Sequence, residues 1–383
     1  MNENPRDPDE LDPHPWLPDE PSQPITPIVL VRGEGLPPEF RFPPRPYRPR
    51  RKLALILFLL TCASTVVAGY FQFRVLSHVE DQRTGKIVKP TDRLSRDSKL
   101  VLVFDWRQSL LNGLTYSIAV MTVLGAHEMG HYLQARRYGV PASLPYFIPM
   151  PFSPLGTMGA VIVQQAGVAD RKALFDIAIS GPLAGLAVAI PLNWWGILHT
   201  TINKVGPGGG GFTNPPIVEW MIAWLQRPLQ PGEDVALTPI LHAGWVGILI
   251  TAINLIPIGQ LDGGHLLYCL IGKPAQRVAR ALYFAAIGVV VYHVVWGSGE
   301  YVYLALLLGL IGLMGAAHPP TANDRVPLGW PRIILGWLTL AFIFVGFVPS
   351  PMYENKPQPP PAAPRLIAPV AELAADAKLP DEK

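Results

Sequence analysis

Charged side chains are scarce in this 383-residue chain. They make up 15% of the residues, against 49% for apolar ones, whereas soluble domains carry about 25% charged residues. A chain of this length with so little charge cannot cover two or three soluble domains with a polar surface. The composition therefore argues against a soluble protein.

Cysteine is almost absent, and this excludes two further classes. Cys62 and Cys269 both lie in or beside apolar segments, and neither has a partner in a soluble loop. A disulfide framework and a cysteine zinc cluster are excluded on these grounds. We expect both thiols to be small packing residues.

What the chain has instead is long apolar runs. Most reach the ~17–25 residues that cross a hydrocarbon core of ~30 Å as a helix, so the sequence predicts an all-α polytopic membrane protein with six or seven transmembrane helices between residues 50 and 350. The runs are Leu53–Phe71, Gln108–Ala126, Ala173–Leu198, Leu237–Leu261, Ala281–Gly299, Tyr301–Ala317 and Ile333–Pro349.

Both ends of the chain are rich in proline. Of 43 prolines, 14 fall in residues 1–49 and eight in residues 351–383, a composition typical of extended, disordered tails. Basic residues crowd just before Leu53, which predicts a cytoplasmic N-terminus under the positive-inside rule. The basic loop Gln72–Trp106 does not fit this orientation. The loop His199–Ala236 contains a glycine run and is predicted to be a flexible link.

One apolar run ends in His127-Glu128-Met129-Gly130-His131. Ionisable groups at membrane depth cost on the order of 2.5–3.5 kcal/mol each and are functional by default. On a helix His127 and His131 lie one above the other and can bind one metal ion, while Glu128 points about 100° away and can reach a metal-bound water as a general base. The alternative is a histidine pair hydrogen-bonded inside a helix bundle.

A catalytic zinc needs a third protein ligand. Asp262 is the best placed, because it follows Pro257, which should end a helix, and precedes Gly263-Gly264 in an irregular stretch near the same membrane face as the histidines. The other candidates are Asp176, His242, His265 and His293. Asp176 precedes a stripe of small residues, Ser180, Gly181, Ala184 and Gly185, which is more typical of close helix packing than of catalysis. His242 and His293 are expected to be hydrogen-bonded within the bundle, whereas His265 could support the site from behind Asp262.

The segment Val140–Gln165 differs from the other apolar stretches. Its prolines forbid a helix, and Gly156–Gln165 is β-branched and marked by glycines, which predicts a short re-entrant strand or hairpin. Non-helical backbone at membrane depth survives where it lines a wet cavity or is buried in protein. We therefore expect a cavity beside the histidines. Trp194-Trp195 is expected to mark a membrane interface.

These motifs together resemble the site-2 protease family of intramembrane zinc metalloproteases. The resemblance rests on His127-Glu128-x-x-His131, Asn254-Leu255-Ile256-Pro257 and Leu261-Asp262-Gly263-Gly264-His265, with a glycine-proline helix between them, and it covers roughly 110–318. Within the family the chain looks most like the plant plastid branch, the ethylene-dependent gravitropism-deficient and yellow-green proteases, and its bacterial relatives. Many bacterial members carry a PDZ domain, for which His199–Ala236 is too short.

The resemblance implies a function. His127, His131 and Asp262 would bind Zn²⁺, Glu128 would be the catalytic base, and Asn254 would hold backbone or substrate in the cleft; the strand containing Gly156 and Gly159 would bind extended substrate. The expected activity is hydrolysis of peptide bonds within transmembrane segments of other proteins, as in regulated intramembrane proteolysis. The expected setting is the lipid bilayer of a bacterial cell membrane, without nucleic acid as a partner.

Two other functions fit part of the pattern. A non-catalytic relative could bind membrane helices as a chaperone or scaffold, but the intact base and ligand set argue against it. A membrane metalloprotease of the prenyl-protein type would use a glutamate as third ligand, where this chain has Asp262-Gly263-Gly264.

Overall fold

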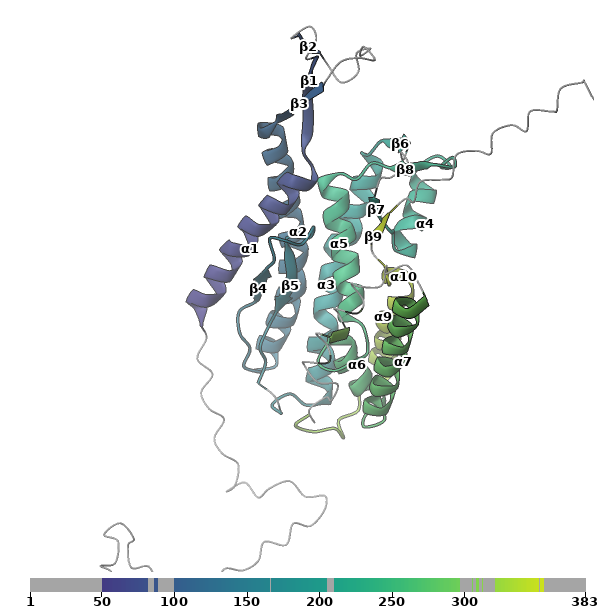
Figure 1. Ribbon diagram of the computed structural model, residues 1–383. Coiled ribbons are helices and arrows are strands. Elements are labelled where there is room, and N and C mark those ends of the chain that lie inside the picture. The colour runs from purple at the N-terminus through teal and green to yellow at the C-terminus, as the bar shows by residue number, and fades with distance from the viewer. Residues whose placement is uncertain are drawn as a thin grey trace, which may run out of the picture. The chain divides into compact units, whose positions relative to one another are not determined.

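The computed structural model in Figure 1 describes residues 50–81, 86–88, 100–165, 167–204, 210–296, 305, 308–309, 312, 321–350 and 352–354. The N-terminal tail, 1–49, lies outside these residues. So does nearly all of 351–383, but Met352–Glu354, within the stretch predicted to be disordered, form a short strand.

Helices dominate the described part of the chain. Four of them are long and apolar enough to cross a membrane: α1 (Arg51–Gln72), α2 (Trp106–Arg137), α3 (Arg171–Leu198) and α7 (Ala275–Trp296). The shorter helices are α4 (Pro216–Leu225), α5 (Pro239–Asn254), α6 (Asp262–Ile271), α9 (Trp330–Ala341) and α10 (Ile343–Gly346).

The predicted number of six or seven spans is not confirmed. The apolar run Leu237–Leu261 yields α5, a helix of 16 residues, because the chain turns after Asn254 ahead of Pro257. The run Ile333–Pro349 is divided between α9 and α10. Most of Tyr301–Ala317 lies outside the described residues.

Short antiparallel strands lie in the connections between the helices and, as β9, after the last of the described helices. The first three form a sheet in the order β2-β1-β3, and the others pair as β4 with β5, β6 with β8 and β7 with β9. Their bounds are Val75–Asp81 (β1), Lys86–Val88 (β2), Leu100–Asp105 (β3), Tyr146–Pro149 (β4), Thr157–Val161 (β5), Ile202–Lys204 (β6), Gly210–Phe212 (β7), Glu233–Val235 (β8) and Met352–Glu354 (β9). The fold is therefore mostly helical rather than purely helical.

The connection His199–Ala236 is not simply a flexible link, as the sequence suggested. Outside residues 205–209, which are not described, it contains β6, β7, α4 and β8. Near the end of this connection, Arg227 donates to both carboxylate oxygens of Glu233, at 2.7 and 2.9 Å. The paired strands give the backbone N–H and C=O groups of this connection hydrogen-bond partners. A glycine-rich composition did not predict this order.

Helices α2, α3 and α5 pack against one another at the centre of the bundle. Their buried side chains form one apolar cluster that includes Tyr116, Val123 and Trp245. Small residues permit the close approach: a Cβ on Gly247 would lie 2.6 Å from a methyl carbon of Val123. This is the close helix packing typical of membrane proteins, where apolar burial against lipid gives little driving force.

The β4–β5 hairpin lies beside α1 and α2 (Figure 1), which confirms the predicted short hairpin. Its turn is fastened to both helices, since Ser64 donates to the carbonyl of Gly156 at 2.6 Å and Tyr116 donates to that of Leu155 at 2.8 Å. Gly156 has φ +72°, and a Cβ there would lie 2.7 Å from the Cα of Thr65. Glycine is thus required at this turn by both backbone conformation and space.

Candidate metal centre

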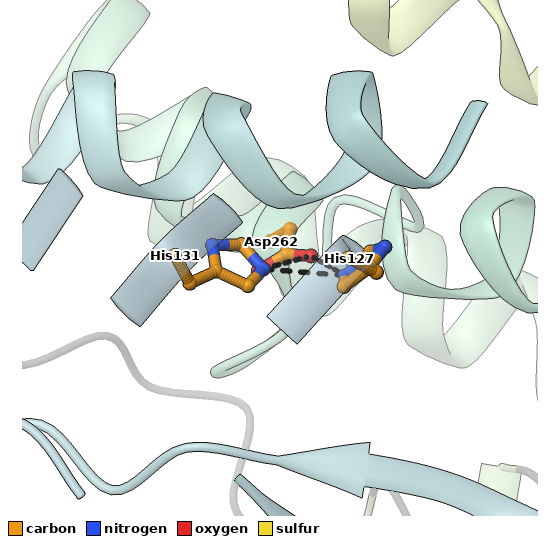
Figure 2. A group of neighbouring side chains, drawn as sticks. All are labelled: His127, His131 and Asp262. Atoms are coloured by element: carbon orange, nitrogen blue, oxygen red, sulfur yellow. Dashed lines mark hydrogen bonds and ion pairs between the residues drawn. The ribbon is translucent and has the colours of Figure 1, made fainter. Parts of the chain in front are cut away.

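His127 and His131 lie one turn apart on α2 and turn their Nε2 atoms toward each other, 3.2 Å apart. Helix α2 continues to Arg137, so the motif lies within the helix rather than at its end. Both side chains are buried, with exposed fractions of 3% and 5%. Figure 2 shows the two rings beside a carboxylate from another part of the chain.

That carboxylate is Asp262, the first residue of α6. Its Oδ2 lies 3.1 Å from Nε2 of His127 and 3.2 Å from Nε2 of His131. The chain returns to the histidines through a tight turn after α5: a Cβ on Gly263 would lie 2.0 Å from the carbonyl oxygen of Leu255. A residue larger than glycine would push the start of α6 away from α5 and move Asp262 with it.

The spacing of these three atoms suits a small tetrahedral cation. Ligands at about 2.0–2.1 Å from a tetrahedral zinc ion lie about 3.3 Å from one another, and the three observed separations are 3.1–3.2 Å. Two imidazole nitrogens and a carboxylate oxygen are a common donor set for catalytic zinc. The residues therefore fit a zinc ion, for which His127, His131 and Asp262 offer three protein ligands. A catalytic zinc ion keeps its fourth position for water.

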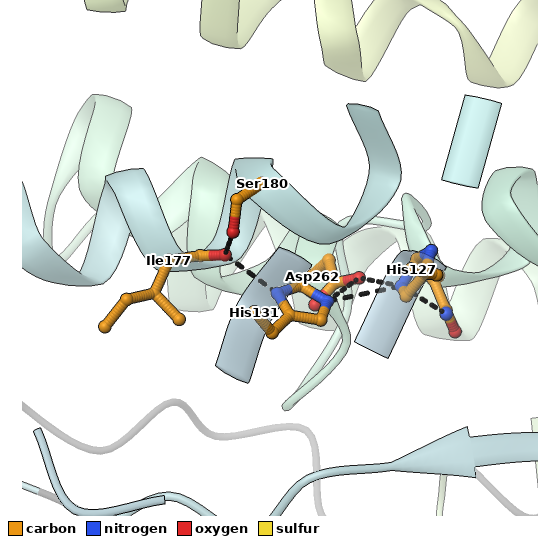
Figure 3. A network of polar contacts seen from close by, with 6 residues as sticks. His127, His131, Ile177, Ser180 and Asp262 are labelled. Atoms are coloured by element: carbon orange, nitrogen blue, oxygen red, sulfur yellow. Dashed lines mark hydrogen bonds and ion pairs between the residues drawn. The ribbon is translucent and has the colours of Figure 1, made fainter. Parts of the chain in front are cut away.

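The outer nitrogens of the two histidines differ. His131 donates from Nδ1 to the carbonyl of Ile177 at 2.7 Å, and Ser180 donates to the same carbonyl at 2.7 Å, as Figure 3 shows. Such a bond fixes the tautomer and orientation of a metal-binding ring. Nδ1 of His127 is buried with no hydrogen-bond partner among the described residues. Its Nε2 lies 3.3 Å from Nδ2 of Asn254, at the end of α5.

Helix α3 contacts the two imidazole rings through glycine residues. A Cβ on Gly181 would lie 2.0 Å from Nε2 of His131, and one on Gly185 would lie 3.1 Å from Nδ1 of His127. In the other direction, a Cβ on Gly130 of α2 would lie 2.5 Å from the carbonyl oxygen of Ser180. The stripe of small residues is therefore a packing surface, as predicted, and its function is to admit the two imidazole rings.

A cavity of about 400 Å³ opens beside the three donor atoms. Glu128, with an exposed fraction of 4%, is in its wall, and the segment from Ala160 to Gln165 lines another side. This confirms the predicted cavity beside the histidines. Gln260, His265 and Thr321 also line it. Gln260 and Thr321 could not be selected from the sequence, since neither belongs to a motif.

The remaining predicted residues lie elsewhere. Gly159 is in β5 one residue before the lining segment, and Gly156 packs against α1 instead of the cavity. Asp176 binds Arg332 of α9 through two hydrogen bonds, at 2.7 and 2.9 Å, and accepts one from Tyr138. This role is structural, as the packing interpretation of its helix suggested.

The other histidine candidates are not in the donor group. His242 is fully buried on α5, and its ring packs among those of Phe73, Tyr116, Phe212 and Trp245. Neither of its nitrogens has a hydrogen-bond partner among the described residues, contrary to the expectation of a hydrogen-bonded bundle histidine. His293 is on α7.

Comparison with known proteins agrees with this geometry. Residues 115–295 match the family described as Peptidase family M50. The chain is 32% identical over 188 residues to "Probable zinc metalloprotease EGY2, chloroplastic" from Arabidopsis thaliana, covering 48% of this chain and 34% of that protein. It is 28% identical over 312 residues to "Probable zinc metalloprotease EGY1, chloroplastic" from the same plant, covering 79% and 53%.

A third relative, "Probable zinc metalloprotease EGY2, chloroplastic" from Oryza sativa subsp. indica, is 26% identical over 266 residues, covering 67% of this chain and 47% of that protein. The chain thus spans about half, or less, of the length of these curated relatives. The matches confirm the predicted resemblance to the plastid branch. With the four candidate spans, they indicate an integral membrane protein.

Proposed function

Since residues 115–295 match Peptidase family M50, the site-2 protease family, we propose that this protein is a zinc endopeptidase that cleaves peptide bonds within the membrane-spanning segments of other proteins. One observation carries the proposal. Nε2 of His127, Nε2 of His131 and Oδ2 of Asp262 converge within 3.2 Å of one another beside Glu128, in a cavity between apolar helices.

The depth of the donor group supports cleavage inside the membrane. On α2, His131 and His127 precede the basic end at Arg136 by five and nine residues, which is about 8 and 14 Å at 1.5 Å per residue. On α3, Gly181 and Gly185 follow the basic residue Lys172 by nine and 13 residues, which is about 14 and 20 Å. Both helices therefore support a metal site roughly 8–20 Å from one face of a hydrocarbon core of about 30 Å.

The residues divide the chemistry among them. His127, His131 and Asp262 would hold zinc, which when bound supplies Lewis acidity for attack of water on the peptide carbonyl. Glu128 takes a proton from the attacking water as the C–O bond forms, and delivers it to the leaving nitrogen as the C–N bond breaks. Asn254, 3.3 Å from His127, is placed to donate from its side-chain amide to substrate backbone in the cleft.

The strand segment beside the cavity is suited to hold an unwound substrate. The backbone groups of Val163 already have partners on the adjacent segment. Its N–H donates to Ser143 Oγ at 2.8 Å, and its carbonyl accepts from the N–H of Ser143 at 2.9 Å. The N–H of Ile162 makes no such bond to any described residue. An extended substrate could pair with this edge while its carbonyl lies beside the donor group.

The setting follows from the family and remains part of the proposal. Substrates would be transmembrane proteins in the surrounding bilayer, reached without a PDZ domain. The relatives are named chloroplastic, so a bacterial cell membrane and a cytoplasmic N-terminus rest on the sequence alone. The intact set of His127, Glu128, His131 and Asp262 argues against a non-catalytic, helix-binding relative.

The proposal is tested with purified full-length protein, its Glu128→Gln variant and a model single-pass substrate in vesicles. The wild type should bind one equivalent of zinc and cleave, whereas Glu128→Gln should bind zinc equally and cleave at least about 100-fold more slowly, as expected for loss of a general base. Equal cleavage by both would exclude the proposed chemistry. A wild type that holds zinc but leaves several substrates intact would favour the non-catalytic alternative.

A further inference from the structure

The end of the bundle opposite the metal centre carries four tryptophans on two helices. Trp194 and Trp195 are near the end of α3, and Trp220 and Trp224 are on α4. We propose that this group, the far-face tryptophans, contacts the headgroup–acyl boundary of the bilayer and fixes the depth of α3. The proposal requires a membrane-spanning chain but no proteolytic activity.

Helix α4 is fastened to the bundle by its apolar face and leaves its tryptophans exposed. Val218, Met221 and Ile222 are buried in the central cluster, whereas the exposed fractions of Trp220 and Trp224 are 61% and 76%. These two residues are four apart and therefore share one side of the helix. Exposed indoles in such numbers are unusual in water and typical of the membrane interface.

The two helices meet at one level. The rings of Trp194 and Trp224 contact edge to face with centroids 5.1 Å apart, and Gln226, just after α4, donates to the carbonyl of Ile197. Trp195, at the same level of α3, is 55% exposed and stacks on His199. The patch thus extends from α3 onto α4.

The length of α3 places this level at a membrane boundary. Ala173 follows the basic pair Arg171-Lys172, and Trp194 is 21 residues further along the helix. At 1.5 Å per residue the separation is about 32 Å, close to the ~30 Å of a hydrocarbon core. If the basic pair lies at one face, the tryptophans lie at the other.

The charge of the patch defines the kind of lipid surface. The single charged residue of α4 is Glu219, which accepts a hydrogen bond from Asn214 at 2.8 Å. Without lysine or arginine on this helix, binding depends on indole partitioning rather than on anionic headgroups. A neutral bilayer should therefore suffice. Because α3 also carries Gly181 and Gly185, the same contact would determine how deep the metal centre lies.

The test uses tryptophan fluorescence of the full chain in phosphatidylcholine vesicles, brominated either near the headgroup or near the chain end. Subtracting the spectrum of Trp220→Phe/Trp224→Phe from that of the wild type isolates the two indoles. We expect this emission to be quenched strongly by headgroup-proximal bromine, weakly by deep bromine, and little by aqueous iodide. Trp245→Phe is the matched control: Trp245 is 1% exposed, so the emission lost with it should respond to neither bromine position.

Three results would overturn the proposal. Quenching by iodide alone would place α4 in water, and resistance to every quencher would indicate a protein partner covering the patch. Stronger quenching by deep bromine would place the patch within the acyl core. Thermal melting of each variant shows whether its spectrum is that of the folded protein. None of these outcomes depends on zinc or cleavage, so they are independent of the proposed function.

Discussion

Gly181 of α3 lies directly against the ring of His131, so closely that a Cβ on it would be 2.0 Å from Nε2. Gly185, one turn along, lies against His127 less tightly, and a Cβ on it would be 3.1 Å from Nδ1. The i, i+4 spacing of the histidines on α2 is thus matched by the i, i+4 spacing of the glycines on α3. Because the glycines have no side chain, the two imidazole rings fit between α2 and α3 although these helices pack closely.

Gly181→Ala should therefore displace His131 and weaken zinc binding. Inserting a methyl group into a packed site costs about 1–3 kcal/mol, which corresponds to an affinity loss of roughly 5- to 150-fold. Zinc affinity is measured by competition with a chelator. Gly125→Ala on α2 is the control, because a Cβ there would meet nothing within 4 Å. Equal zinc affinity for Gly181→Ala and wild type would contradict the packing argument.

Substitution of Asp262 and of Asp176 should distinguish the metal ligand from the structural carboxylate. Asp262→Asn removes a charged donor and should lower zinc affinity by at least about tenfold. Asp176→Asn should leave zinc affinity unchanged but lower the free energy of unfolding by about 1–3 kcal/mol, because Arg332 loses charge-assisted hydrogen bonds. Chelator competition and thermal melting on both variants provide the comparison. Zinc loss in Asp176→Asn with retention in Asp262→Asn would reverse the assignment.

Ile162→Pro tests the strand segment as a substrate edge. Proline removes the N–H that no described residue uses, so we expect cleavage to fall by about tenfold, as for one lost backbone hydrogen bond, with zinc content and melting temperature unchanged. Ile162→Ala keeps the N–H and should cleave at nearly the wild-type rate. Val163→Pro, which would break the bond to Ser143, should instead destabilise the hairpin. Full activity in Ile162→Pro would exclude pairing at this position.

The stabilising effect of the Asp324 carboxylate, which accepts hydrogen bonds near the cavity, should depend on pH. Burial raises the pKa of this carboxyl, but hydrogen bonds from Thr321 and Tyr268 outweigh burial and hold the pKa below its ordinary value. A depressed folded-state pKa stabilises the protein above the unfolded value of about 3.9, and the contribution is lost as pH falls through the folded value. The stability difference between wild type and Asp324→Asn should therefore be constant near neutral pH and shrink below about pH 4. A difference that grows on acidification would contradict this sign.

The donor group could be predicted from the sequence because its information is local. The spacing of His127 and His131 fixes their common helix face, and Pro257 marks the irregular stretch that leads to Asp262, although Asp262 itself begins helix α6. The partner of His131 could not be predicted, because the acceptor is the backbone carbonyl of Ile177 and every residue has one.

The connections between helices were predicted less well. Strands β6 and β7 contain three residues each, too few for a period of two to be recognised, and β7 pairs with β9 about 140 residues further along the chain. From the sequence, Asp176 was a candidate metal ligand. Its actual partner, Arg332, is 156 residues away and could not be identified from the local pattern. Such pairings depend on tertiary contacts, which residue patterns within one segment do not encode.

The most direct test of the central claim is the position of the bond that is cut. A single-pass substrate is incubated with the full-length protein in vesicles, and both product ends are identified by mass spectrometry. The account predicts a single cut inside the apolar segment, roughly 8–20 Å from one membrane face, lost in Glu128→Gln and after zinc removal. A cut confined to the soluble flanks, or one that persists in Glu128→Gln, would contradict it.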